Sequence, residues 1–89
     1  MLEREIEITN KLGLHARAAA KLVKVAGAFT STIEIEKQDQ RVNAKSIMSV
    51  MMLAASRGNT VKLYIEGDDQ EDAMTSVTNL IESKFGEDE

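Results

Sequence analysis

Apolar residues alternate with polar ones in three stretches of the chain, which is typical of strands that bury one face. These stretches cover residues 2–9, 32–36 and 61–66. A short segment at 41–43 follows the second stretch after the polar run 37–40, and this spacing predicts a β-hairpin. The chain is therefore expected to form four strands.

Three further stretches repeat apolar residues at the spacing of a helix. The first begins at Ala16 and ends near Gly27, and the second covers residues 46–56. The third follows Asp68 and Asp69, two residues that can cap a helix start. The first helix is expected to bury Ala16, Ala19, Ala20, Leu22, Val23 and Ala26, and the third to bury Ala73, Val77, Leu80 and Ile81 with Met74 at the edge.

The resulting order β-α-β-β-α-β-α indicates an α+β fold in which helices cover one face of a single sheet. Several four-stranded arrangements fit this order, so the pattern leaves the order of strands within the sheet open. A length of 89 residues fits one compact domain, residues 1–89, whose acidic end 86–89 is expected to fray.

Composition excludes several classes of function. The chain has no cysteine and one histidine, which argues against disulfides, thiol catalysis and the usual zinc sites, so neither a metal nor a cofactor is expected. A formal net charge of −4 opposes binding to nucleic acid or to an anionic membrane surface. The first residues lack the continuous apolar run of a signal peptide or a membrane span, which predicts a cytoplasmic protein.

The single histidine, His15, lies one residue before the first predicted helix, and Arg17 follows two residues later. A helix start has unpaired backbone N–H groups and a partial positive charge, so the N–H groups of Ala16 and Arg17 favour a bound phosphate there. Arg17 itself is a cation at the positive end of the helix dipole, which is unfavourable. An anion bound beside Arg17 would offset this, so the placement also indicates an anion site. The alternative is that His15 only caps the helix and has no reactive role.

Two separate motifs resemble the HPr family of phosphocarrier proteins: GLHAR at 13–17 followed by AA at 19–20, and KSIM at 45–48. The resemblance covers essentially the whole chain. It implies an open-faced β-sandwich of four antiparallel strands backed by three helices. It also implies a role in the phosphoenolpyruvate-dependent phosphotransferase system, in which enzyme I phosphorylates the active-site histidine of HPr and HPr passes the phosphoryl group to enzyme IIA components. His15 matches that histidine.

The residues around His15 are consistent with this chemistry. A neutral imidazole is a competent nucleophile near neutral pH, and the Arg17 guanidinium can form bidentate hydrogen bonds to phosphate oxygens. No general base, metal cage or glycine-rich phosphate loop is evident in the sequence. We therefore expect a monomeric carrier that partner enzymes use as a substrate, rather than a self-sufficient enzyme.

One residue departs from the family pattern, because Ala18 stands where the family usually has proline. Proline in a first helical turn fixes φ without losing a needed hydrogen bond. Its absence costs about 0.4–1 kcal/mol of stability through the unfolded state, so the turn after His15 is expected to be less stiff.

Ser46 matches the serine that, in HPr proteins of some bacteria, is phosphorylated by an ATP-dependent HPr kinase/phosphorylase. Serine is also a favoured N-cap, and the run that follows it is helical in period. The two roles are compatible, because a phosphate adds close to two negative charges at the surface without requiring unfolding.

The second predicted helix has more apolar residues than one sheet can cover. Val50, Leu53 and Ala54 share one side, and the other side consists of Ile47, Met48, Met51 and Met52. The resemblance implies that enzyme I, enzyme IIA components and the kinase dock on this second side, carried over to Ile47, Met48 and Met51; the alternative is that loops cover it. Two other functions stay open: a carrier in a nitrogen-related or purely regulatory branch, and a non-catalytic interaction module that docks through residues 46–52.

Overall fold

The computed structural model describes residues 1–88. Its elements confirm the predicted order β-α-β-β-α-β-α, with a short 3₁₀ turn, η1, added after the last helix. They are β1 (Leu2–Glu7), α1 (Ala16–Gly27), β2 (Thr32–Lys37), β3 (Gln40–Asn43), α2 (Ile47–Met52), β4 (Thr60–Glu66), α3 (Gln70–Glu82) and η1 (Lys84–Gly86).

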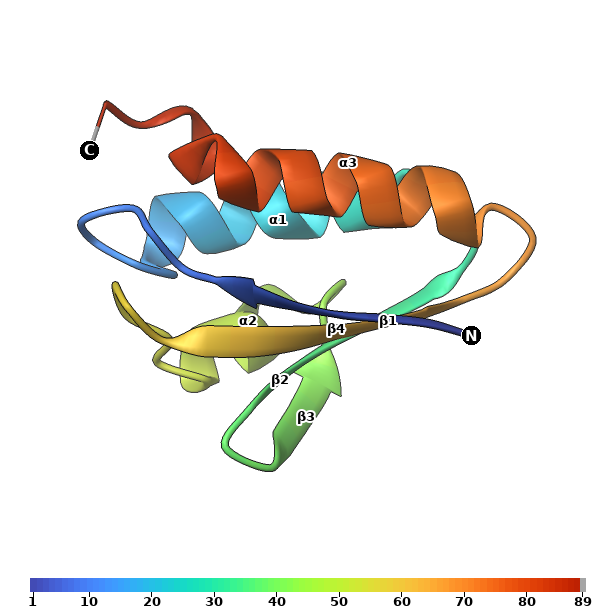
Figure 1. Cartoon of the computed structure of the whole chain (residues 1–89), viewed down its shortest axis with the longest axis horizontal. Coiled ribbons are helices and arrows are strands. Elements are labelled where there is room, and N and C mark those ends of the chain that lie inside the picture. The colour runs from blue at the N-terminus through green and yellow to red at the C-terminus, as the bar shows by residue number, and fades with distance from the viewer. Residues whose placement is uncertain (89) are drawn as a thin grey trace.

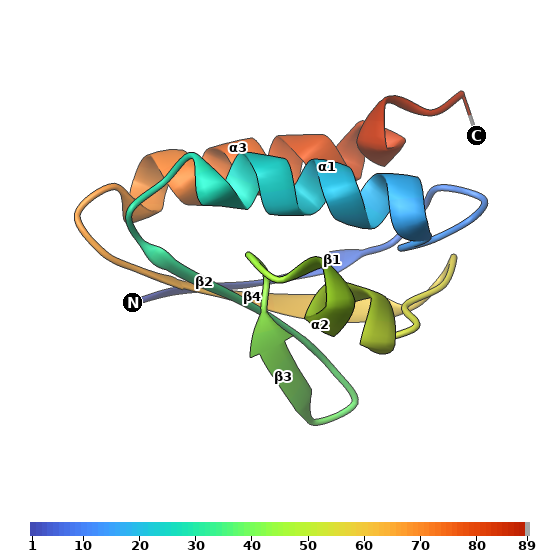
Figure 2. The same ribbon diagram turned by 180° about the vertical axis from the view of Figure 1, so that it is seen from behind.

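The four strands form one antiparallel sheet in the order β1-β4-β2-β3. Helices α1 and α3 lie side by side over one face of the sheet, as Figures 1 and 2 show from opposite sides. The shorter α2 contacts α1 and β3. This arrangement is the open-faced sandwich that the family resemblance implied, and it supplies the strand order that the sequence pattern had left open.

The predicted hairpin joins β2 to β3 through a tight two-residue turn. Gln38 and Asp39 both have positive φ, 49° and 68°, between the paired residues Lys37 and Gln40. A turn of this kind follows the right-handed twist of the strands, and polar residues tolerate it best after glycine. The polar run at 37–40 therefore forms the turn that its composition predicted.

The core lies between the sheet and the two long helices. Alternate strand residues such as Ile33, Ile35 and Leu63 are fully buried, as the period-two pattern predicted. In α1 the prediction was partly wrong: the buried residues are Ala18, Ala19, Leu22 and Ala26, whereas Ala16 and Ala20 are exposed and Val23 is half-buried. Four of the five residues 16–20 are alanine, so the apolar pattern there does not define which side faces the core.

In α3, burial of Ala73, Val77 and Ile81 is confirmed, and Met74 is 9 % exposed. Leu80 is only half-buried, because it lies where α3 faces the outer edge of α1 beside Val25 and Phe29. The buried face of this helix also includes Thr78, which the pattern did not predict.

The chain after α3 differs from its prediction. Phe85 is fully buried within η1, and Lys21 of α1 donates a hydrogen bond to its carbonyl oxygen at 2.6 Å. This anchor fixes Gly86 in the 3₁₀ turn, and Glu87 is half-buried with side-chain partners. Gly86 and Glu87 thus have defined contacts, which the sequence pattern did not predict. Fraying of the end 86–89 stays a prediction, and Glu89 lies outside the described residues.

Helix α2 is shorter than predicted, ending at Met52 instead of near Ser56. Its last turn tightens through the bonds Leu53 N to Val50 O at 3.2 Å and Ala54 N to Met51 O at 3.1 Å, and Ala54 then takes a positive φ of 51°. Lys37 of β2 donates to the carbonyl oxygens of Leu53 and Ala54. These donors satisfy the helix end, so the apolar residues that follow need not continue the helix.

At the other end of the molecule, Asp69 joins two loops. Its side chain makes no capping bond to α3, contrary to prediction, and instead accepts bonds from the backbone N–H of Thr30 at 2.8 Å and of Ser31 at 2.9 Å, and from the Ser31 hydroxyl. These donors, the Ser31 hydroxyl foremost, lower the pKa of Asp69 to about 2. Gly67 permits this approach, because a Cβ there would lie 2.6 Å from Ser31 Cα.

No helix within residues 1–88 is long and apolar enough to cross a membrane.

Candidate functional site

The loop before α1 places His15 through contacts with a distant segment. Asn10 donates a side-chain hydrogen bond to the carbonyl oxygen of Gly13 at 2.8 Å, and the N–H of Leu14 donates to the carbonyl oxygen of Ala55 at 2.8 Å. Gly13 has a positive φ of 63°, and a Cβ at this position would lie only 2.5 Å from the same Ala55 oxygen. Glycine is therefore required for the loop to pack against the segment that follows α2.

His15 lies one residue before α1, as predicted, and is its N-cap residue. Its carbonyl oxygen accepts the first intrahelical hydrogen bond, from Ala19 N at 2.8 Å, and its ring atom Nδ1 accepts a long bond of 3.3 Å from the backbone N–H of Arg17. The side chain is 24 % exposed. The ring thus lies at the surface, with Nδ1 facing the positive end of the helix.

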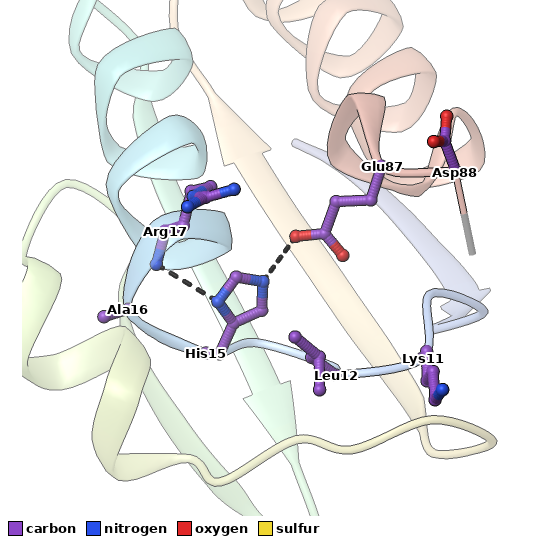
Figure 3. A pocket seen from close by; sticks show the side chains of 7 residues that line it. All are labelled: Lys11, Leu12, His15, Ala16, Arg17, Glu87 and Asp88. Carbon is purple, nitrogen blue, oxygen red and sulfur yellow. Dashed lines mark hydrogen bonds and ion pairs between the residues drawn. The ribbon is translucent and has the colours of Figure 1, made fainter.

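The opposite edge of the ring, Nε2, contacts the carboxylate of Glu87 (Figure 3). The second oxygen of that carboxylate accepts a bond from Asn10 Nδ2 at 3.0 Å. The hydrogen bond from Asn10, followed by that from His15, lowers the pKa of Glu87 below its usual value, so the carboxylate is ionised at neutral pH. Asn10 therefore holds both the loop that carries His15 and the carboxylate that contacts the ring.

These contacts define the tautomer of the neutral ring. An atom that accepts from Arg17 N–H carries a lone pair, and an atom that faces an ionised carboxylate carries the proton. Both ring nitrogens therefore have partners in the structure. The long contact to Nδ1 still leaves its lone pair at the helix start, where a ligand can approach.

Arg17 and Ala16 line the same open depression as His15, which has a volume of about 760 Å³ (Figure 3). Within residues 1–88 the Arg17 guanidinium has no hydrogen bond or ion pair. An unpaired cation on the first turn of a helix is unfavourable unless an anion binds beside it. The lining residues are Lys11, Leu12, His15, Ala16, Arg17, Glu87 and Asp88.

Sequence reasoning missed Glu87 and Asn10. The available signal was Phe85, a large apolar residue in a polar tail, because such a residue is expected to be buried and so to hold its neighbours against the domain. No group of acidic and histidine residues suited to a metal ion occurs in the part of the chain that the structure describes.

Ser46 lies outside this depression, at the N-cap of α2, where its Oγ accepts a bond from Ser49 N at 3.4 Å. The capping role predicted for Ser46 is thus present. The predicted exposure of the outer side of α2 is also confirmed: Ile47 is 40 % exposed, Met48 68 %, Met51 39 % and Met52 68 %. The bond from Leu14 to Ala55 connects the segment after α2 to the His15 loop.

Comparison with known proteins gives consistent matches over the whole chain. A family model described as the PTS HPr component phosphorylation site matches residues 2–83. The phosphocarrier protein HPr of Cupriavidus necator is 52 % identical over 89 residues, which cover 100 % of both chains. The crystal structure of an HPr from Thermoanaerobacter tengcongensis is 56 % identical, with a TM-score of 0.96 and 100 % of both chains covered. A second structure, of an HPr dimer from that organism, is 57 % identical with a TM-score of 0.79 and covers 98 % of this chain and 100 % of its own.

Proposed function

The chain belongs to the HPr family of the phosphotransferase system, and from this premise we propose that it accepts a phosphoryl group on His15 from phosphorylated enzyme I and passes it to enzyme IIA components. The observation that carries the proposal is the arrangement of the imidazole. Nδ1 lies at the start of α1, in a depression that the Arg17 side chain also lines, and Nε2 faces an ionised carboxylate.

The arrangement favours Nδ1 as the phosphoryl acceptor. Its lone pair forms a bond to phosphorus while the bond from phosphorus to the donor atom of enzyme I breaks, and the electron pair of that bond stays on the donor. Because the ring proton is on Nε2, Nδ1 has no proton to lose and the step requires no general base. Transfer to enzyme IIA is the same exchange in reverse.

Charge is distributed to suit this step. The ring becomes positive as Nδ1 bonds to phosphorus, and Glu87 on its far edge stabilises that charge. The phosphoryl oxygens lie on the other edge, where Arg17 and the N–H groups of Ala16 and Arg17 can bind them. The Arg17 N–H that now donates to Nδ1 is released when Nδ1 forms its new bond, and it becomes available to a phosphoryl oxygen.

We propose that partners dock on a patch formed by Ile47, Met48 and Met51, the outer surface of α2. These side chains are exposed although apolar, and methionine adapts to partners of different shape. Helix α2 contacts α1, and the segment after α2 contacts the His15 loop through the bond from Leu14 to Ala55. These contacts support a single partner surface that covers both the patch and His15.

Ser46 is proposed as a regulatory phosphorylation site for an HPr kinase/phosphorylase. It adjoins the docking patch and is half-buried, with its hydroxyl on the cap of α2. A phosphate at this position introduces close to two negative charges beside Ile47 and Met48, which weakens an apolar interface by desolvation cost.

A cytoplasmic location and a monomeric working form complete the proposal. A monomer leaves the surface around His15 accessible to two different partners in turn, which suits a carrier better than a dimer does. Light scattering at working concentration tests it, and a stable dimer that covers His15 would contradict it.

The deciding experiment is transfer from phosphoenolpyruvate through a cognate enzyme I. Wild type is expected to acquire one acid-labile phosphoryl group, and His15→Ala to acquire none. Unlabelled wild type, in the presence of a second HPr that is labelled by the same enzyme I, would overturn the proposal and favour a non-catalytic module that docks through residues 46–52.

The same preparation separates a sugar-uptake branch from a nitrogen-related or regulatory one. Phosphorylated protein is offered to the enzyme IIA components of the host, one at a time, and the fastest acceptor defines the branch.

A further inference from the structure

Four of the five methionines in the chain are accessible to solvent, and three of them belong to one six-residue helix. Met48 and Met52 are each 68 % exposed and Met51 is 39 % exposed, whereas Met74 in α3 is 9 % exposed. Oxidation of a thioether requires access of the oxidant to sulfur. The structure therefore separates three exposed methionines in α2 from a protected one in α3.

The fold of α2 does not depend on these three side chains. Val50, which is fully buried, and Leu53, which is 3 % exposed, attach the helix to the core. Its two ends are held by the Ser46 cap and by the bonds from Lys37. A chemical change confined to the exposed sulfur atoms consequently alters the surface and leaves the packing of the helix intact.

The same change strongly affects an apolar interface. Conversion of methionine to its sulfoxide replaces a flexible apolar group with a polar one that has a strong hydrogen-bond acceptor. An acceptor buried without a donor is unfavourable, so a partner that covers Met48 and Met51 binds the sulfoxide form less well.

We propose that Met48, Met51 and Met52 form a peroxide-sensitive site that controls partner docking. A sulfur lone pair attacks one oxygen of a hydroperoxide, so an S–O bond forms as the O–O bond breaks. The other oxygen takes the proton and leaves as water or an alcohol. Sulfur is oxidised by two electrons and the peroxide is reduced by two. A thiol-dependent sulfoxide reductase restores the thioether. The control of docking rests on the function proposed above, whereas the position of the reactive sulfur atoms does not.

The test begins with graded hydrogen peroxide on the full chain, followed by peptide mapping. Met48 and Met52 are expected to oxidise first, Met51 later and Met74 last. Oxidation of Met74 at the rate of Met48 would overturn the assignment of the site. The thermal unfolding midpoint is expected to stay unchanged while only the α2 sulfoxides are present.

The second measurement is the rate of phosphoryl transfer from phosphorylated enzyme I at several concentrations of treated and untreated protein. Oxidation of α2 is expected to raise KM about tenfold or more, as loss of a central apolar contact does, with kcat little changed. An unchanged KM for fully oxidised α2 would overturn the proposal. Untreated protein that accepts no phosphoryl group would instead overturn the proposed function, while the order of oxidation would still test the site.

A matched variant isolates the three sulfur atoms. Met48→Leu, Met51→Leu and Met52→Leu together preserve apolar volume and remove the thioethers of α2, while Met1, which is 57 % exposed, stays oxidisable. Whatever the basal rate of this triple variant, its treated-to-untreated KM ratio is expected to stay near one. A ratio that rises as in wild type would assign the effect to another residue and contradict the proposal.

Discussion

The loops that flank the two ends of α1 are each held by a carboxylate from a distant part of the chain, but the two carboxylates face different kinds of group. At the C-terminal end Asp69 accepts bonds from Thr30 and Ser31, whose donors are backbone N–H groups and a hydroxyl. At the N-terminal end Glu87 faces an imidazole ring, which can bind a proton or a phosphoryl group. The Asp69 contacts form a fixed joint between two loops. Glu87, in contrast, contacts a ring whose charge changes during the proposed reaction.

The supports of the two ends differ as well. Thr30 and Ser31 lie in the loop directly before β2, so the Asp69 joint is tied to the sheet. Glu87 lies beyond the last helix and depends on Phe85 and its bond from Lys21. The position of the carboxylate beside His15 therefore depends on the buried ring of Phe85 as well as on the bond from Asn10. The first prediction below tests how strongly Phe85 anchors this segment.

Phe85→Ala is expected to have the largest effect. Removal of a fully buried phenylalanine lowers the free energy of unfolding by about 3–5 kcal/mol, because a cavity remains under η1. Urea denaturation measures the loss. Phe29→Ala, at a half-buried ring near the other end of α1, is the matched control and is expected to cost less. Equal losses would show that Phe85 is not the anchor.

Asp69→Asn is expected to change how stability depends on pH. The pKa of Asp69 is lowered from 3.8 to about 2 in the folded protein, so its contribution is fully present above pH 4 and is lost as the pH falls toward 2. Wild type is expected to be more stable than the variant at pH 7, and the difference is expected to shrink between pH 4 and pH 2. Thermal unfolding across this range measures the difference.

The control for this joint is Asp68→Asn, because Asp68 is the exposed neighbour of Asp69. Asp68→Asn is expected to leave the fall in stability between pH 4 and pH 2 unchanged. A difference between wild type and Asp69→Asn that does not vary with pH would contradict the role assigned to the charge of Asp69.

Glu87→Gln is expected to slow phosphorylation of His15 by about tenfold. This is the lower end of the loss that follows removal of a group that orients a functional histidine, as known for histidines at metal sites. The rate of transfer from phosphorylated enzyme I measures the effect, and NMR of the ring nitrogens reports the accompanying loss of the form protonated at Nε2. Asp88→Asn is the matched control, with no expected change in either. A normal rate with an altered tautomer would show that Glu87 determines which ring nitrogen carries the proton but does not assist phosphoryl transfer.

Ala18→Pro is expected to have the smallest effect, a gain of about 0.4–1 kcal/mol in the free energy of unfolding. Ala18 is in the first turn of α1, and the two backbone bonds at this helix start use the N–H groups of Arg17 and Ala19. A loss of stability in urea denaturation would show that the fully buried site cannot hold the proline ring.

The sheet was predictable because its signal is local. Residues such as Ile33, Ile35 and Leu63 are buried at every second position, and this period defines both the strands and their inward faces. The order of strands was not predictable from pattern, because β1 pairs with β4 across more than half the chain and alternation carries no information on partners. The buried side of α1 was mispredicted for a related reason, since a run of alanines has no distinct apolar side.

The site was predictable in part. His15 and Arg17 are close in sequence, so helix geometry alone places them together at one helix start. Glu87 is 72 residues from His15, and its contact depends on the burial of Phe85 and on Asn10, neither of which a local motif reports. The roles of these residues in phosphoryl transfer stay predictions until the variants are measured.

The isolation of one imidazole between a helix start and a carboxylate has a practical consequence for spectroscopy. With a single histidine in the chain, the carbon-bound protons of the ring give resonances that no second imidazole obscures. One of these protons lies between the two nitrogens and the other lies next to Nε2, so their shifts respond differently to events at the two edges. Unlabelled protein in solution thus contains its own reporter of phosphoryl occupancy and of carboxylate contact.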